Sequence, residues 1–228
     1  MDKKEIADSS KNKIEKMVQK KYGKKRTNEA FVYAKRIKAI LEKMAVEGIN
    51  DVSIKASILK IIDKRPEILM AQLGNHRYNL GMIAADLKEE WFVLKALDYQ
   101  EASLQQDYIG ENIGMHAAQA RLERATLKAL ENTNASIQQS VSGRNIGMCA
   151  AENALEEATL KAIKNPVARS QKTYLQDTIK TIARGAGLAR VVEAYDELAQ
   201  NKNPKKKKYI RKEPRDLTID EIGRELGL

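Results

Sequence analysis

The side chains best suited to nucleophilic or metal chemistry are one cysteine, Cys149, and two histidines, His76 and His116. A single cysteine cannot form an internal disulfide, and this set lacks the grouping of Cys and His residues that a zinc site needs. Cys149 lies in an alanine-rich helical pattern, which favours a small buried residue over a nucleophile. The sequence shows no glycine-rich phosphate loop and no Ser, Cys or acidic set beside a histidine. We therefore expect a protein that is not an enzyme and that binds no metal and no cofactor.

The positive charge of the chain, a net +10, is concentrated at its two ends. Residues 1–26 hold 10 Lys and Arg against 4 Asp and Glu, residues 202–228 hold 9 against 5, and the middle holds 22 of each. Residues 11–22 have the spacing of a basic amphipathic helix. A run that is typical of phosphate contact or of a nuclear import signal comprises Lys205, Lys206, Lys207, Lys208, Arg211 and Lys212. A solvated linker that aids solubility is the other interpretation of this run.

The strongest pattern in the sequence is an internal repeat. Residues 79–85 (NLGMIAA) recur as 112–118 (NIGMHAA) and 145–151 (NIGMCAA), at intervals of 33 residues. A weaker fourth copy follows at the same interval, with Ile179, Ala183, Gly187 and Leu188. The connecting segments repeat as well, with glutamines at 105, 138 and 171. A fixed period of this length indicates stacked structural repeats.

Each repeat reads as a short helix, a tight turn, a longer helix and a loop. Asn112 is a favourable N-cap for the first helix, because its side-chain oxygen can accept a bond from a free backbone N–H. Residues 122–130 carry apolar or small side chains at helical spacing, so the second helix buries one face. A unit of this size cannot bury that face alone, and stacking of the units is therefore required.

Three glycines, Gly81, Gly114 and Gly147, recur inside the predicted first helices. A glycine costs a helix about 1 kcal/mol relative to alanine, so its recurrence requires a reason. We expect close approach of stacked helices at these positions. Met82, Met115 and Met148 follow the glycines and are expected to fill the gaps in the core.

The period of 33 and the order of elements resemble the ankyrin repeat. Residues 107–112 (DYIGEN) match the family's D-x-x-G-x-T frame with Asn112 in the Thr place, and residues 122–130 match its second helix. The family's Thr-Pro-Leu-His is replaced by Asn-Ile-Gly-Met, which removes the usual Thr–His hydrogen bond, and the loop glycine recurs as Gly110 and Gly143. Another helical solenoid of similar period is the alternative.

The resemblance implies an all-α, ankyrin-like helical repeat solenoid with flanking basic tails. We expect a basic N-terminal tail or helix (1–26) and a helical cap (27–64), built from helices at 28–47 and about 52–62. The repeats then occupy residues 65–201, at about 65–97, 98–130, 131–163 and 164–197. A basic linker (202–216) and a short C-terminal amphipathic helix (217–228) complete the chain.

In the ankyrin family, the loops and inner helices line a concave surface that binds another protein. Carried over by position, the partner-binding residues would be Asn75, His76, Tyr78, Asp86, Tyr108, Ile109, Glu111, Gln119, Val141, Arg144, Glu152, Asn153, Tyr174, Leu175 and Asp177. Tyrosine is enriched at interface hot spots, although these tyrosines could also merely cover the loop ends.

The expected function is therefore a protein–protein interaction scaffold for an unidentified partner, in the manner of divergent bacterial or phage ankyrin proteins that act as effectors or inhibitors. The alternative is a nucleic-acid-associated protein that uses its basic tails for phosphate contact. Homo-oligomers through exposed terminal repeats remain open. No run of about 18 apolar residues and no secretory signal occurs, so we expect no membrane contact and a cytoplasmic location, or a host cell or nucleus for an effector.

Overall fold

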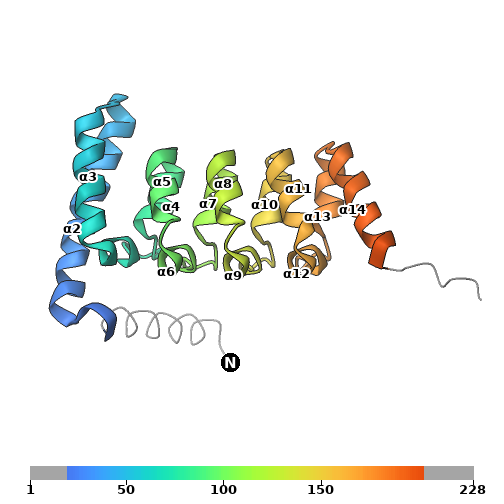
Figure 1. The fold of residues 1–228 in the computed structure, drawn as a ribbon, viewed down its shortest axis with the longest axis horizontal. Helices are drawn as coiled ribbons and strands as arrows, with labels where there is room; N and C mark the ends of the chain where they lie inside the picture. Colours follow the sequence, from blue (N-terminus) through green and yellow to red (C-terminus); the bar gives the residue numbers. More distant parts are fainter. Residues whose placement is uncertain (1–19, 203–228) are drawn as a thin grey trace, which may run out of the picture.

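The computed structural model describes residues 20–202, and within this range the protein is all-helical (Figure 1). Apart from Lys202, the predicted basic linker, with its cations from Lys205 to Lys212, lies outside the described residues, as do the predicted helix at 217–228 and residues 1–19. Of the described helices, none is both long enough and apolar enough to cross a bilayer.

The N-terminal end of the stack consists of a long helix, α2 (Lys24–Glu47), a second helix, α3 (Val52–Lys64), and a 3-10 helix, η1 (Pro66–Met70). α2 buries residues at intervals of three and four along one face, from Ala30 to Met44. It ends at Gly48, whose φ of 64° suits a left-handed C-cap. α2 begins at Lys24 rather than near residue 28, so it includes part of the segment that we assigned to the basic tail.

The remaining helices repeat in groups at the expected interval of 33 residues. The first helices are α4 (Leu80–Asp86), α7 (Ile113–Gln119), α10 (Ile146–Glu152) and α13 (Ile179–Gly185). The second helices are α5 (Glu90–Ala96), α8 (Glu123–Ala129), α11 (Glu156–Lys164) and α14 (Ala189–Lys202). The predicted longer second helix is therefore found only in the last two units, since α5 and α8 have seven residues, like α4 and α7.

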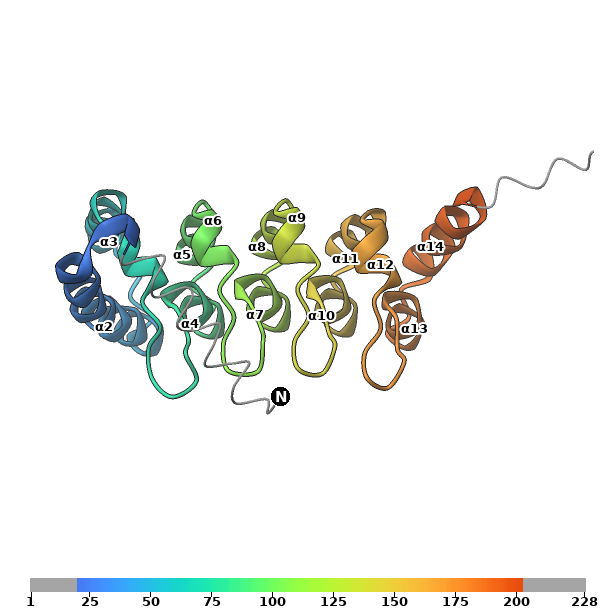
Figure 2. The same ribbon diagram turned by 90° about the horizontal axis from the view of Figure 1, so that it is seen from below.

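The connecting segments contain short helices that the sequence pattern did not predict: α6 (Gln100–Ser103), α9 (Thr133–Ser136) and α12 (Pro166–Ser170). Figure 2 shows α4, α7, α10 and α13 in one layer and α5, α8 and α11 in the other. Neighbouring units contact each other within both layers. The loops that precede α4, α7, α10 and α13 extend on the same side as this first layer.

A buried Asn–Gln ladder holds α4, α7 and α10 to the segments that follow them. Asn112 caps α7 by accepting a bond from the Met115 backbone N–H (3.1 Å), as predicted. Its side-chain amide donates to the carbonyl of Ala135 (3.0 Å) and to the side-chain oxygen of Gln138 (2.8 Å). Gln138 in turn donates to the carbonyl of Leu104 in the preceding unit (2.8 Å).

The same bonds recur one unit earlier, through Asn79 and Gln105, and one unit later, through Asn145 and Gln171. These asparagines are fully buried. Because a buried polar group without a partner costs about 1–3 kcal/mol, the ladder fixes both the fold of each unit and its position on the previous one.

The recurring glycines mark close contact between units, as predicted. A Cβ atom at Gly114 would lie 2.5 Å from Ile146 Cδ1 and 2.7 Å from Ala129 Cβ. Met115 is fully buried, but the side chain that fills the space over Gly114 belongs to Ile146 of the next unit. In the last unit the position of Gly114 is occupied by Lys180, which pairs with Asp196 of α14. A long side chain at this position is compatible with a stack that ends at α13 and α14.

Candidate protein-binding surface

Four loops, at residues 73–78, 106–111, 139–144 and 172–177, stand side by side next to the first helices (Figure 2). We call these loops, together with the adjoining sides of α4, α7, α10 and α13, the loop face. Backbone hydrogen bonds join each loop to the next: Tyr108 N–H to His76 O (3.1 Å), Val141 N–H to Ile109 O (2.7 Å) and Tyr174 N–H to Ser142 O (3.1 Å). The loop tips therefore form a continuous, hydrogen-bonded row rather than four independent segments.

All four loops contain a residue with a left-handed backbone at the same position of the repeat. These residues are Arg77 (φ 59°), Gly110 (φ 81°), Gly143 (φ 82°) and Gln176 (φ 67°). Glycine is required where the next loop is close: a Cβ at Gly143 would lie 2.9 Å from the carbonyl oxygen of Lys172. The first and last loops thus keep the turn of the two middle loops without its glycine.

Most of the residues expected to bind a partner are accessible on the loop face. Tyr108, Val141, Tyr174 and Leu175 are apolar or aromatic and expose 48%, 62%, 70% and 70% of their surface. Asn75, His76, Asp86 and Glu152 are also exposed, whereas Tyr78, Ile109, Gln119, Arg144, Asn153 and Asp177 are half-buried. Glu111 is only 2% exposed, so its carboxylate acts inside the protein and offers little area to a partner.

The loop face contains a hollow of about 600 Å³ between the last three loops. Its lining joins the apolar side chains of Ile109, Val141 and Tyr174 to the polar ones of Glu111, Ser140, Ser142 and Arg144. A concave site with mostly apolar walls and a few fixed polar groups is the usual form of a site that accepts a single anchoring side chain or a small ligand. Sequence position alone did not reveal the two serines.

His116, on the loop-face side of α7, bridges two units. Its Nδ1 lies 2.9 Å from a carboxylate oxygen of Asp86, at the end of α4, and its Nε2 lies 3.3 Å from a carboxylate oxygen of Asp107. Both partners are acceptors, so both ring nitrogens donate and the ring carries a positive charge. Burial alone lowers the pKa of His116, but the hydrogen bonds to Asp107 and Asp86 and their negative charges outweigh it and raise this pKa to about 9.

Asp107 also shapes its own loop. Its other carboxylate oxygen accepts bonds from the backbone N–H groups of Ile109 (2.9 Å) and Glu111 (2.8 Å). The loop is closed by a further bond from the Asp107 N–H to the Glu111 carbonyl (2.9 Å). One buried aspartate therefore orders the loop and ties it to His116.

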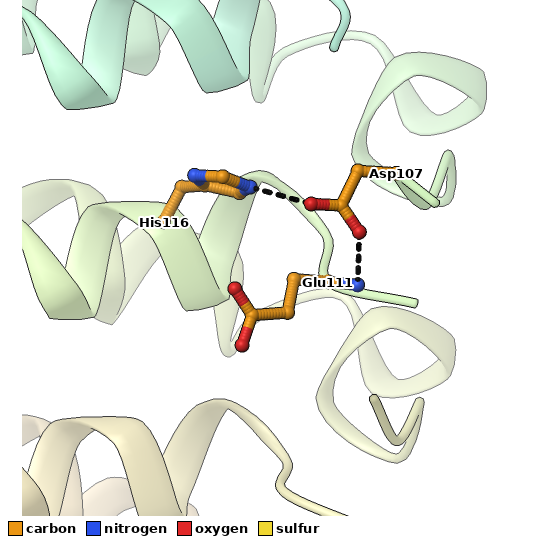
Figure 3. Close-up of side chains that lie close together, drawn as sticks. All are labelled: Asp107, Glu111 and His116. Carbon is orange, nitrogen blue, oxygen red and sulfur yellow. Dashed lines mark hydrogen bonds and ion pairs between the residues drawn. The ribbon is translucent and has the colours of Figure 1, made fainter. Parts of the chain in front are cut away.

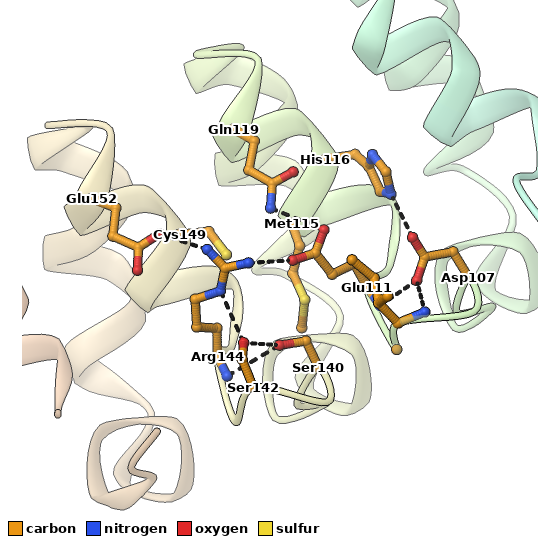
Figure 4. Close-up of polar contacts among 12 residues, drawn as sticks. Asp107, Glu111, Met115, His116, Gln119, Ser140, Ser142, Arg144, Cys149 and Glu152 are labelled. Carbon is orange, nitrogen blue, oxygen red and sulfur yellow. Dashed lines mark hydrogen bonds and ion pairs between the residues drawn. The ribbon is translucent and has the colours of Figure 1, made fainter. Parts of the chain in front are cut away.

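A second cation, Arg144, belongs to the next unit and lies between two carboxylates (Figure 4). Its guanidinium donates to Glu111 (2.8 Å) and to Glu152 (3.1 Å), and its Nε donates to Ser142 Oγ (3.1 Å). Glu111 also accepts a bond from Gln119 (2.9 Å). A charge network of this kind holds the loop tips and first helices in fixed relative positions.

Asp107, Glu111 and His116 lie close enough together to suggest a metal site, since one potential ligand atom from each falls within 4.8 Å of the others (Figure 3). Their existing bonds argue for a different role. His116 is protonated between two aspartates, and Glu111 is neutralised by Arg144. A cation would have to displace both positive charges, so the residues fit an internal ion network better than a metal centre.

Cys149, also on a first helix, is fully buried. Burial raises the pKa of its thiol to about 12, and the nearby Arg144 charge offsets only part of this effect. Because the thiolate is the reactive form of cysteine, Cys149 is unsuited to nucleophilic chemistry at neutral pH. This agrees with its interpretation as a small buried residue.

The sequence predicted which residues lie at the loop tips, but it did not predict the ion networks of His116 and Arg144. Asp107 carried one signal, its place in the D-x-x-G frame, whereas His116 was considered only as a possible metal ligand. The partners of His116 are 30 and 9 residues away, and no sequence spacing indicates such contacts.

No model of a known protein family matches this chain, and a search of curated proteins finds no similar sequence.

Proposed function

We propose that this protein is a non-enzymatic, ankyrin-like repeat scaffold that binds a partner protein through the loop face. The observation that supports this most strongly is the row of joined loop tips, which displays Tyr108, Val141, Tyr174 and Leu175 beside a hollow. Exposed aromatic and aliphatic side chains on a rigid frame bury area on binding with little loss of conformational entropy. These apolar side chains lie outside the core, so core packing does not account for them.

The two-layer stack at a 33-residue interval supports the ankyrin-like assignment. The Asn–Gln ladder stands in for the family's Thr–His bond, and the left-handed turn is present in all four loops. The bonding of His116 to two aspartates and the suppressed ionisation of Cys149 favour binding over catalysis, because neither group is free to act as a base or a nucleophile.

The role that we propose is that of an effector or inhibitor acting on one cytoplasmic target, with self-association as the competing outcome. The test begins with capture of a partner from cells of the native host and its purification. Affinity is then measured for the wild type and for Val141→Asp and Tyr174→Ala. We expect each loop-face variant to weaken binding at least tenfold, about 1.4 kcal/mol, as is typical of hot-spot residues.

Val167→Asp is the matched control. Val167 is 50% exposed on α12, across the stack from the loop tips, so this variant makes the same chemical change at a comparable exposure. It should leave affinity unchanged. Equal weakening by Val141→Asp and Val167→Asp, or full affinity in both loop-face variants, would show that the loop face does not bind the partner. If the chain bound only to a second copy of itself, the protein would be a homo-oligomer and not a scaffold for another protein.

A further inference from the structure

The side of α2 that faces away from the stack carries a row of cations. We call this side the α2 basic face; it comprises Lys24, Lys25, Lys35, Arg36 and Lys43, all of which are exposed. They lie opposite the buried face that runs from Ala30 to Met44. Within the described part of the chain, none of the five forms an ion pair with an acidic side chain. The positive charge of this face is therefore not neutralised by the fold.

The acidic residues of α2 are mostly engaged elsewhere. Glu29 pairs with Arg65 (2.9 Å), and Glu42 pairs with Lys38 on its own helix (2.6 Å). Glu47, at the end of the helix, is the remaining carboxylate. The face thus has five cations that pair with no acidic residue of the range 20–202, against a single acid at its edge.

Cations in the repeats have a different role. Lys128 donates to the Leu94 carbonyl of the preceding unit (2.8 Å) and pairs with Asp98, and Lys161 does the same with Leu127 (2.9 Å) and Glu131 (3.1 Å). These lysines join neighbouring units, whereas no cation of the α2 basic face bonds to another helix among the described residues. For Lys35, Arg36 and Lys43, the zero net charge of residues 27–201 concealed this difference, because a net charge does not separate paired from unpaired cations.

We propose that the α2 basic face binds the phosphate backbone of a nucleic-acid duplex. From Lys24 to Lys43 the helix rises about 28 Å, which corresponds to about eight base pairs of B-DNA. Four of the five residues are lysines, whose ammonium groups are point charges suited to phosphate oxygens. The expected contact is therefore with the phosphate backbone, and binding depends on charge rather than on sequence. This binding is separate from the partner protein proposed for the loop face.

A membrane surface fits these residues less well. A helix that lies in a bilayer interface needs a free apolar face, and the apolar face of α2 is buried in the core. Phe31, the aromatic residue of the outward side, is covered by Lys35, whose ammonium lies 4.6 Å from the ring centre. The other exposed apolar residues of α2, Val32, Ile40 and Val46 (50%, 39% and 85%), are spread along the helix between the cations and form no continuous apolar stripe. A hydrated polyanion therefore matches this face better than lipid does.

The test uses the full chain and a labelled DNA duplex of about 24 base pairs, with the dissociation constant measured by fluorescence anisotropy between 50 and 200 mM salt. The first variant changes all five residues of the α2 basic face to glutamine. If all five contact phosphates, the log–log slope of affinity against salt falls by up to about 4.5, and the wild type loses up to about 500-fold more affinity than the variant across this range. The double variant Lys35→Gln, Arg36→Gln should lower the slope by about 1.8.

The matched control removes the same charge from five exposed cations of the repeats that likewise form no ion pair within the described residues: Lys88→Gln, Arg121→Gln, Lys164→Gln, Lys172→Gln and Arg184→Gln. It should keep the wild-type slope. Equal losses in the control and the α2 variant would attribute binding to net charge alone and overturn the proposal. So would an absence of duplex binding at 50 mM salt, or binding only to vesicles that contain phosphatidylserine. Circular dichroism confirms that each variant is folded.

Discussion

Replacing Gly114 with alanine tests whether the stacking of units, rather than helix propensity, determines this residue. In an ordinary helix the change from glycine to alanine stabilises by about 1 kcal/mol. Here the new Cβ would lie 2.7 Å from Ala129 Cβ and 2.5 Å from Ile146 Cδ1. Ile146 can rotate its terminal methyl away, but the Cβ of Ala129 is attached directly to the backbone of α8. The clash is therefore relieved only if α7 and α8 separate.

The magnitude follows from these distances. Carbon atoms in favourable contact lie about 3.5–4.0 Å apart, so the two helices must move by about 1 Å. Overpacking of this size costs about 1–3 kcal/mol and outweighs the gain in propensity of about 1 kcal/mol over most of that range. We expect Gly114→Ala to lower the free energy of unfolding by up to about 2 kcal/mol.

The assay is urea denaturation followed by circular dichroism, with Gly185→Ala as the control. Gly185 ends α13, and a Cβ there would meet nothing within 4 Å, so its replacement should stabilise the protein by about 0.5 kcal/mol. Opposite signs for the two substitutions are the expected result. A stabilised Gly114→Ala would refute the close approach of α7 to its neighbours.

Three further predictions concern the ladder, the charge network and the loop row. Asn112→Ala should cost about 2–4 kcal/mol, because it leaves buried donors and acceptors unpaired, whereas the less buried cap variant Asn132→Ala should cost about 1 kcal/mol; urea denaturation compares them. Because the pKa of His116 is raised from its usual 6.5 to about 9, its stabilisation is complete below pH 6.5 and is lost as the pH rises through 9. The stability difference between wild type and His116→Gln should thus shrink over that range, by up to about 3 kcal/mol, and a pH-independent difference would contradict the ion network. Gly143→Ala should destabilise more than Gly74→Ala in the same assay, because both have positive φ but a Cβ at Gly74 meets nothing within 4 Å.

The sequence was sufficient to predict the helical class, the 33-residue interval and the Asn112 cap, because each of these depends on residue types that are close together in the sequence. Asn112 is a cap by its chemistry and its position before a helix, and Gly114 indicates close contact because a helix otherwise excludes it. The recurring glutamines were visible, but not that they bond to the asparagines. That bond joins residues 26 positions apart, and it depends on how the connecting segment folds back.

The one-turn helices of the connecting segments escaped prediction because they are too short to show a periodic pattern. The division of α2 into a buried side and a basic side depended on where the stack begins. In the candidate site, the exposed loop residues followed from register within the repeat. The burial of Glu111 and its ion pair with Arg144 did not, because the pair joins residues of two different units.

The most direct test of partner binding at the loop face is site-specific photo-crosslinking in cells of the native host. A photoreactive amino acid is placed at Tyr108 or Tyr174 on the loop face, and at Val167 on α12 as the control. We predict that one protein is crosslinked from both loop-face positions and not from Val167. Crosslinking of that protein from Val167 alone, or equally from all three positions, would contradict the assignment of the loop face as the binding surface.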